Sequence, residues 1–238
     1  MPPSSYPPRT QENLILASLS PQNYESVLPH LEQVHLIRGQ ILNEIGLTIE
    51  YAYFPMEGMI SLLSAIEDGG TIEIGFTGND GVVGLSVILG VKISPYRAIV
   101  QIPSVAMRIK AHLLKSEFDQ GGRLRAVLLR YAHALLTQVS QFAVCNHFHK
   151  VEKRLCLWLL ITRDLLQADT FEFTQEFLSN MLGVPRTSVT MIASSLQKAG
   201  LIHYRRGKIQ LLNHRGLEST VCECYRIIKE ERDAIFSH

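Results

Sequence analysis

The 238-residue sequence has few of the features that mark secreted, membrane-bound or strongly charged proteins. It contains only four cysteines, too few for the disulfide framework of a small secreted domain. No apolar run approaches the ~20 residues that a membrane-spanning helix needs. The N-terminal segment MPPSSYPPRTQ lacks the apolar core of a secretory signal. We therefore expect a cytoplasmic protein with a flexible tail over residues 1–9.

Sequence motifs of common enzyme classes are also missing. There is no Gly-x-Ser-x-Gly nucleophile elbow, no glycine-rich phosphate loop and no HExxH zinc motif. The histidines, serines and carboxylates form no recognisable catalytic constellation. An enzyme is therefore not expected.

The cysteines and histidines lack the spacing of a zinc or iron–sulfur motif. Cys145, His147 and His149 form one group, but in a helix the three do not share one face. A second group lies toward the C-terminus and consists of His203, His214, Cys222 and Cys224. We predict packing or surface roles for both groups and no metal site, with metal binding as the alternative.

The chain does contain a helix-turn-helix pattern over residues 174–199. Thr174 can cap the first helix, Gly183 suits a turn that needs φ > 0, and Pro185 fits the first turn of the second helix. The apolar residues spaced to pack the two helices together are Leu178, Leu182, Val184, Val189 and Ile192. An ordinary core hairpin is the alternative, but several positional requirements are met together, which favours DNA binding.

The segment after this pattern predicts a wing, which is a basic hairpin that reaches neighbouring phosphates. Residues 201–212, LIHYRRGKIQLL, indicate two short strands with Arg206-Gly207-Lys208 at the tip. Polar groups here and on the second helix can donate to phosphates and base edges. The predicted DNA contacts are Thr174, Gln175, Arg186, Thr187, Ser188, Thr190, Met191, Arg205, Arg206 and Lys208.

The distribution of charge supports the same interpretation. The whole chain has a net charge of only +1. Residues 174–215, however, hold six Lys and Arg against one acidic residue, whereas residues 1–110 hold six basic and ten acidic residues. A basic patch confined to the recognition region is typical of specific DNA binding and predicts steep salt dependence.

The N-terminal part, residues 10–111, predicts an α+β arrangement dominated by an antiparallel, jelly-roll-like β domain. Two short helices are expected first, over residues 11–19 and from Ser20-Pro21 onward. Short strands separated by Gly, Pro, Asp and Asn are then expected. They cover residues 34–42 (two strands around Gly39), 50–55, 58–66, 70–76, 96–103 and 105–110.

Helical periodicity follows over residues 112–149. A heptad-like seam is formed by Leu124, Leu128, Tyr131, Leu135, Gln138 and Phe142, and it continues to Cys145. Because one helix cannot bury such a stripe, we predict that this seam pairs with a second copy. The alternative is packing on the chain's own β domain, which the neighbouring face could also cover: Val127, Leu136, Val139 and Ala143. Residues 150–238 are then the DNA-binding domain, with helices over 151–166 and 215–236.

The predicted elements follow the order β-roll, long helix and winged helix-turn-helix. In this order the chain resembles the Crp/Fnr superfamily of bacterial transcription regulators. The resemblance covers nearly the whole chain from about Thr10 and is most specific over residues 174–207. It implies a homodimer that places the second helix of the motif in the major groove of a palindromic operator, with RNA polymerase as a further partner. Arg186 would contact guanine. Family members often carry a Glu and a second Arg where this chain has Thr187 and Met191, so the operator sequence should differ.

The sensor half departs further from the family pattern. The cyclic-nucleotide cassette of the family corresponds here to Gly84, Leu85, Ser86, Arg97 and Ala98. Leu85 replaces the Glu that holds the ribose, and an apolar side chain cannot accept that hydroxyl. We therefore expect no cofactor and no cyclic AMP binding in the usual way; gating by a cyclic nucleotide or another small molecule through Arg97 is the alternative. The iron–sulfur branch needs N-terminal cysteines, and none precedes Cys145. A regulatory or scaffold module that does not bind DNA is the remaining hypothesis.

Overall fold

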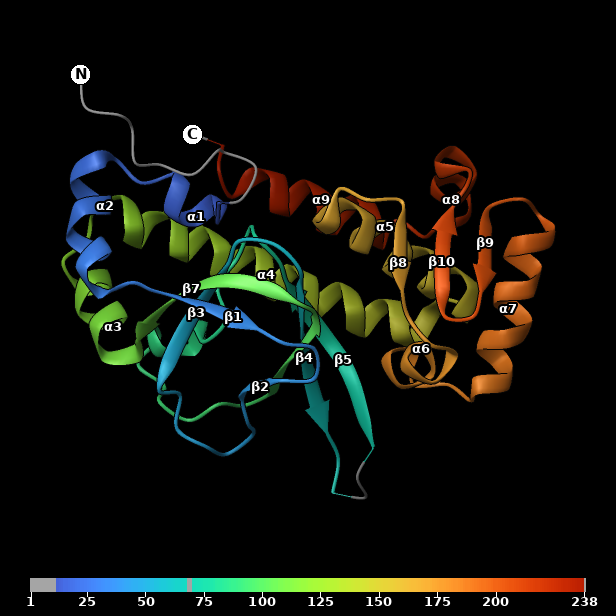
Figure 1. Ribbon diagram of the computed structural model, residues 1–238, viewed down its shortest axis with the longest axis horizontal. Coiled ribbons are helices and arrows are strands. Elements are labelled where there is room, and N and C mark those ends of the chain that lie inside the picture. Colours follow the sequence, from blue (N-terminus) through green and yellow to red (C-terminus); the bar gives the residue numbers. More distant parts are fainter. Residues whose placement is uncertain (1–11, 68–69, 238) are drawn as a thin grey trace. The chain divides into compact units, whose positions relative to one another are not determined.

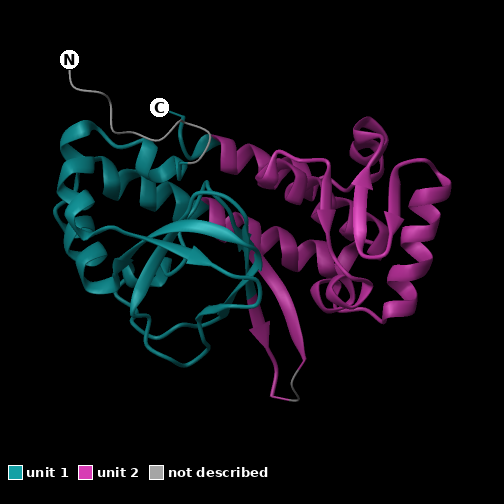
Figure 2. Cartoon of the chain, in the orientation of Figure 1, with its two compact units in different colours: residues 1–62, 76–133, 234–238 teal, residues 63–75, 134–233 magenta. Residues whose placement is uncertain are grey.

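The computed structural model describes residues 12–67 and 70–237, and Figure 1 shows the order of its helices and strands. The chain divides into two compact units (Figure 2). Unit 1 comprises residues 1–62, 76–133 and 234–238, and unit 2 comprises residues 63–75 and 134–233. The predicted tail over residues 1–9 and Gln11 of the first predicted helix lie outside the described residues. No helix in the described ranges is long and apolar enough to cross a membrane.

Unit 1 begins with α1 (Leu14–Ala17), α2 (Pro21–Val27) and the 3-10 turn η2 (Leu28–His30), so both expected N-terminal helices are present. Asn13 caps α1 and is only 2% exposed. Its Oδ1 accepts hydrogen bonds from the backbone N–H groups of Ile15 and Leu16, and its Nδ2 donates to the carbonyls of Pro55 and Gly81. A buried amide that makes all these bonds fixes α1 against two segments of the β domain, the strand that ends at Pro55 and the loop that contains Gly81.

The strands lie close to their predicted positions. They are β1 (Glu32–Leu36), β2 (Ile41–Asn43), β3 (Tyr51–Pro55), β4 (Met59–Ala65), β5 (Thr71–Thr77), β6 (Arg97–Ile102) and β7 (Ser104–Lys110). They form a three-stranded sheet in the order β1-β7-β3 and a four-stranded sheet in the order β2-β6-β4-β5. The Gly39 turn is present, but the strands on either side of it pair with different partners, β7 and β6. Buried apolar residues such as Phe54, Ile60 and Ile109 supply the core.

The helical segment after β7 contains two helices rather than one. α3 (Ala111–Asp119) ends before Gln120, and α4 (Gly122–Phe148) follows. Gly121 and Gly122 have φ values of +89° and +70°, a conformation in which a β-carbon would be strained. The two glycines therefore interrupt the predicted continuous helix.

The predicted dimer seam of α4 is buried within the chain, which corrects that assignment. Leu124, Leu128, Tyr131, Gln138 and Phe142 are at most 8% exposed, and Leu135 is half-buried. The Tyr131 hydroxyl lies 3.0 Å from Thr77 Oγ1, and a β-carbon at Gly81 would lie 2.4 Å from the same hydroxyl. Likewise, a β-carbon at Gly75 would lie 2.5 Å from Gln138 Oε1. Because β5 and the loop after it cover this face, a heptad pattern alone could not identify its partner.

A different face of α4 is exposed. Leu129, Leu136 and Val144 are 45%, 65% and 39% exposed, and their spacing places them on one side of the helix. Leu136 belongs to the face that the sequence interpretation assigned to the β domain. Ala143 of that face is also exposed, Val139 is half-buried and Val127 is fully buried, so only part of the face is open.

Unit 2 contains the helix-turn-helix and the segments around it. Its elements after α4 are α5 (Val151–Leu166), β8 (Thr170–Glu172), α6 (Gln175–Leu182), α7 (Arg186–Lys198), β9 (Ile202–Arg205), β10 (Lys208–Leu211), α8 (His214–Thr220) and α9 (Cys224–Ala234). The three strands form a sheet in the order β8-β10-β9. The sequence analysis did not predict strand β8. The predicted C-terminal helix over residues 215–236 is instead two helices, because the backbone at Val221 is extended (φ −66°, ψ 160°).

The core of unit 2 is built around Trp158 of α5. Its ring packs edge-on against Phe173 with centroids 4.7 Å apart, and Phe173 stacks on Phe177 at 4.7 Å. Its Nε1–H donates to Glu73 Oε2 at 2.8 Å, so the indole nitrogen is satisfied while buried. These contacts fix the start of α6, the first helix of the motif.

Candidate nucleic-acid interface

The turn between α6 and α7 has the geometry that the sequence predicts. Thr174 caps α6 by accepting a hydrogen bond from the Phe177 N–H at 3.1 Å. Gly183 has φ +61°, a backbone conformation that favours glycine. Crowding does not require glycine here, because a β-carbon would contact only Ile72, at 3.7 Å. Ser179 Oγ donates to the Val184 carbonyl at 2.5 Å and closes the turn from the other side.

The inner face of the motif is apolar. Leu178, Met181 and Leu182 of α6 are buried, as are Val189, Ala193 and Leu196 of α7. Val184 and Ile192, which the sequence also assigned to this packing, are half-buried. Met181, Ala193 and Leu196 were missed, although they share the helical spacing of the residues that were identified.

The outer face of α7 presents the predicted DNA contacts. Arg186, Thr187, Thr190 and Met191 are exposed, and Ser188 is half-buried. Met191 is 67% exposed. Gln175 Oε1 accepts hydrogen bonds from Thr190 Oγ1 at 3.0 Å and from Arg186 Nε at 3.4 Å. The first turns of the two helices are thereby linked.

The wing is a tight hairpin beside this face. Arg205 pairs with Lys208, so the two-residue loop is Arg206-Gly207, with φ values of +51° and +82°. Positive φ at both positions is the geometry of the hairpin turn that matches strand twist. Arg205, Arg206 and Lys208 are all exposed.

Tyr204 and Gln197 hold the wing in place, and the sequence interpretation assigned neither to the site. The Tyr204 hydroxyl donates to the Phe173 carbonyl at 2.8 Å, and its backbone N–H donates to Gln197 Oε1 at 2.8 Å. Burial raises the pKa of Tyr204, so its hydroxyl keeps its proton and remains a donor. Tyr204 also lines a hollow of about 360 Å³ with Thr174, Gln175, Arg186, Arg206 and Gly207. Four of the ten predicted contacts therefore surround one hollow, which the wing and both helices share.

The sensor residues do not form a comparable site. Gly84 has φ +91° and begins the 3-10 turn η3 (Leu85–Val87), in which Leu85 is 5% exposed. Arg97 Nε donates to both carboxylate oxygens of Glu44, at 3.0 and 2.9 Å. This hydrogen bond lowers the pKa of Glu44. Arg97 is therefore already engaged with an anion of the chain itself.

A cavity of about 750 Å³ lies elsewhere in unit 1. Its lining includes Ile49, Val87, Lys92, Lys110 and Lys115. Gly84, Leu85, Ser86, Arg97 and Ala98, the predicted ligand residues, are not part of that lining.

Some members of the two predicted cysteine and histidine groups come together in unit 2. The side chains of Cys145, His149, Cys222 and Cys224 lie together, whereas His147, His203 and His214 are not part of the group. Hydrogen bonds from the Cys145 thiol and the Cys224 backbone N–H lower the pKa of Cys222 to about 6. Burial raises the pKa of Cys224 to about 12.

Comparison with known proteins agrees with this geometry. Residues 153–220 match the Crp-like helix-turn-helix domain family. No curated protein matches the chain. Among solved structures, FixK2 from Bradyrhizobium japonicum is 16% identical, with a TM-score of 0.70 over 81% of this chain and 98% of that one. A putative Crp/Fnr-family regulator from Eubacterium rectale ATCC 33656 is 17% identical, with a TM-score of 0.69 over 87% and 96%.

A third structure with this fold is CLP of Xanthomonas campestris, described as a c-di-GMP-responsive global regulator. It is 16% identical, with a TM-score of 0.69 over 82% of this chain and 100% of that one. At these identities the structures establish the fold, and the matched domain identifies the motif. Residues 153–220 therefore form a Crp-like helix-turn-helix domain, and the chain as a whole shares its fold with these solved regulator structures.

Proposed function

We propose that the chain binds a palindromic operator as a homodimer, with α7 in the major groove, and that it does so without cyclic AMP. The observation that carries this proposal is the surface shared by α6, α7 and the wing. There Arg186, Gln175 and Arg206 line one hollow, with Thr190 bonded to Gln175 and Met191 exposed nearby on α7. These groups match the two tasks of specific binding, contact with base edges and contact with phosphates.

The residues divide by reach and chemistry. Arg186 lies at the first position of α7, where a guanidinium can make paired hydrogen bonds to guanine O6 and N7. Thr187, Thr190 and Met191 follow on the same helix, and an apolar side chain such as Met191 suits a thymine methyl. Thr174, Gln175 and Ser188 at the helix starts, with Arg205, Arg206 and Lys208 of the wing, suit phosphates.

The homodimer rests on the exposed stripe of α4 rather than on the seam that the sequence predicted. Leu129, Leu136 and Val144 form an apolar surface that a second copy of the helix can cover. Two-fold pairing would present two α7 helices to half-sites about 34 Å apart, one turn of DNA. An operator with inverted repeats follows from that symmetry. A contact with RNA polymerase stays a prediction from the resemblance.

The absence of a cyclic AMP requirement rests on two side chains. Leu85 offers no acceptor for a ribose hydroxyl, and Arg97 would have to leave Glu44 before it could bind a cyclic phosphate. Gating by a different effector is the second candidate. The 750 Å³ cavity, with Ile49 and Val87 beside Lys92, Lys110 and Lys115, suits an anionic molecule with an apolar part.

Fluorescence anisotropy on DNA from the region upstream of the chain's own gene tests the proposal. The titration is run at two salt concentrations, with and without cyclic AMP, and a shuffled duplex of the same composition is the control. We expect binding that prefers the upstream DNA, weakens steeply with salt and is unchanged by cyclic AMP. Binding only with cyclic AMP would overturn the sensor assignment, and equal binding to the shuffled duplex would overturn specific recognition.

A further inference from the structure

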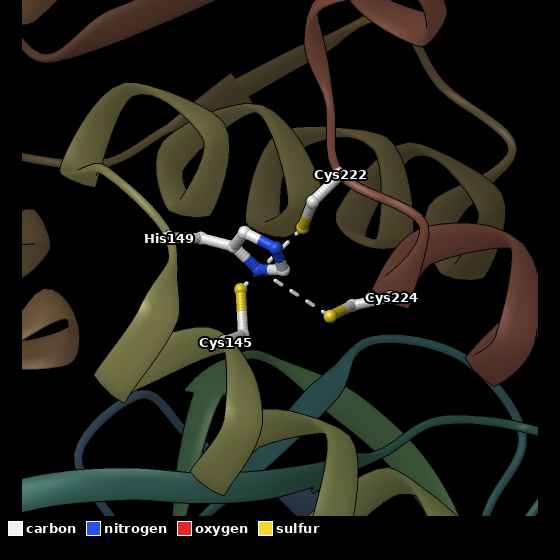
Figure 3. Close-up of side chains that lie close together, drawn as sticks. All are labelled: Cys145, His149, Cys222 and Cys224. Carbon is white, nitrogen blue, oxygen red and sulfur yellow. Dashed lines mark hydrogen bonds between the residues drawn. The ribbon is translucent and has the colours of Figure 1, made fainter.

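Four side chains of types that can bind a metal ion come from distant parts of the sequence and meet in unit 2 (Figure 3). Cys145 lies in the last turn of α4 and His149 just beyond that helix. Cys222 and Cys224 lie where α8 gives way to α9. One donor atom from each residue lies within 4.8 Å of all the others.

The local backbone explains how the side chains converge. Cys145 and His149 are four residues apart, and the His149 N–H donates to the Cys145 carbonyl at 3.1 Å, so both side chains project from one face. Cys222 and Cys224 flank a turn in which the Tyr225 N–H donates to the Cys222 carbonyl at 3.2 Å. The two pairs then face each other from opposite segments (Figure 3).

We propose that Cys145, His149, Cys222 and Cys224 bind one Zn²⁺ ion. A tetrahedral Zn²⁺ with Zn–S near 2.3 Å and Zn–N near 2.0–2.1 Å separates two sulfur ligands by about 3.8 Å, and a sulfur from a nitrogen by about 3.5 Å. In the structure Cys145 Sγ lies 3.6 Å from Cys222 Sγ, and Cys224 Sγ lies 3.6 Å from His149 Nδ1. These separations are those of the edges of a tetrahedron around a single ion.

Burial supports a closed, structural kind of site. Cys145, Cys222 and Cys224 are at most 3% exposed, and the His149 side chain is 13% exposed. Binding removes a proton from each of the three thiols and leaves the imidazole neutral, so the protons pass to solvent and no redox step is needed. The loaded site carries a net charge of −1.

Groups around the four ligands suit that charge and geometry. The Nε2 atom of His149 lies 3.5 Å from Glu223 Oε2, and a carboxylate on the far nitrogen is the usual partner of a metal-binding histidine. That contact leaves Nδ1 to face the thiols. Arg154 and Cys145 line the same small cavity, and the buried Nε of Arg154 has no hydrogen-bond partner. A cation in this position compensates the negative charge of three thiolates around one Zn²⁺.

Two other uses of these residues fit less well. An iron–sulfur cluster spreads its cysteine ligands over several irons, whereas these four donor atoms all lie within 4.8 Å of one another. A disulfide between Cys145 and Cys222 would need the sulfurs to move from 3.6 Å to about 2.05 Å and would leave the third thiol and the imidazole unexplained. A bound Zn²⁺ uses all four and ties the end of α4 to the start of α9.

Metal analysis of the full-length protein, purified without added metal and again after Zn²⁺ loading and desalting, tests the proposal. We expect about one tightly held Zn²⁺ per chain. Replacement by Co²⁺ should give the visible bands of a tetrahedral ion together with a thiolate-to-cobalt band in the near ultraviolet. Both measurements use the wild-type protein, so neither requires a variant that folds. A loaded wild-type protein without stoichiometric metal, or a Co²⁺ spectrum without the thiolate band, would overturn the proposal.

Variants locate the ion. Cys224→Ser and His149→Gln should each weaken Zn²⁺ binding by at least about tenfold, whereas the matched controls Cys156→Ser and His147→Gln should retain it. A chelator should lower the Tm of the wild type but not that of Cys224→Ser. Retention of Zn²⁺ by both ligand variants would refute the assignment. So would a mass lower by two hydrogen atoms in the metal-free wild type together with a Cys145–Cys222 peptide, because that result identifies a disulfide pair.

Discussion

At the scale of single residues, Arg186 carries most of the predicted sequence preference. It lies at the start of α7, and Gln175 holds its Nε by a long hydrogen bond of 3.4 Å. Such a bond orients the guanidinium but is weak enough to be exchanged for a base edge. Gln175 also accepts from Thr190, so it positions two candidate DNA contacts at once.

Arg186→Ala should weaken binding to a specific operator by about 1–3 kcal/mol and relax the base preference at one position of each half-site. The reason is the loss of paired hydrogen bonds to guanine. Anisotropy titrations on the operator and on duplexes with single base changes measure both effects. Arg226→Ala, which removes a charge paired with Glu230 on α9, is the control. Unchanged affinity and preference in Arg186→Ala would contradict the assignment of the reading residue.

Gly81 is a residue that packing rather than turn geometry requires. A β-carbon there would lie 2.4–2.5 Å from the hydroxyl and ring carbons of Tyr131, which is 5% exposed. Gly81→Ala should therefore lower the free energy of unfolding by about 1–3 kcal/mol in urea denaturation. In a Tyr131→Ala background the same substitution should cost much less. Equal costs in both backgrounds would show that the tyrosine is not the obstacle.

At the scale of elements, much of the fold could be predicted because local signals are strong. A few adjacent residues determine where a helix starts, through an Asn, Ser or Thr cap, and where a turn forms, through Gly or Pro. Helix α5, both helices of the motif and the wing accordingly lie where the sequence places them. The short strand β8 was missed because its edge pairing with β10 is a long-range contact without a local signal.

Long-range packing explains why two features of the site could not be predicted from the sequence. The apolar spacing of α4 predicts a buried stripe, but not whether β5 or a second copy buries it. Similarly, Cys145, His147 and His149 share no helical face as a trio, whereas Cys145 and His149 alone do. Their convergence with Cys222 and Cys224 depends on the break between α8 and α9, which the sequence interpretation replaced by one continuous helix.

The exposed stripe of α4 yields a prediction at this scale. Leu136→Glu keeps a good helix former but places a charge in the proposed dimer interface, so it should shift the protein toward monomer and weaken operator binding. Light scattering coupled to size-exclusion chromatography gives the mass directly. Leu89→Glu, at a site 62% exposed and outside α4, is the matched control. A Leu136→Glu protein that stays dimeric at the same concentration would exclude this face as the interface.

At the scale of the whole molecule, the charge distribution favours regulated contact with DNA over indiscriminate attraction. A net charge of +1 gives the chain little general affinity for a polyanion. The segment that carries α6, α7 and the wing, residues 174–215, holds six Lys and Arg against one acidic residue. Affinity for DNA should therefore depend on a small number of cations placed against phosphates. In the proposed dimer, each of these phosphate contacts occurs twice.

Arg206→Ala tests this doubling. Each phosphate contact contributes about 0.9 to the slope of log K against log[salt], so losing one contact in each half of a dimer should reduce the slope by about 1.8. The affinity should fall by the same factor on specific and shuffled duplexes, because a phosphate contact carries no sequence information. Arg226→Ala, which removes an exposed cation of α9, should leave the slope unchanged. A reduction near 0.9 would mean that only one wing contacts DNA, and no reduction would mean that Arg206 does not face a phosphate.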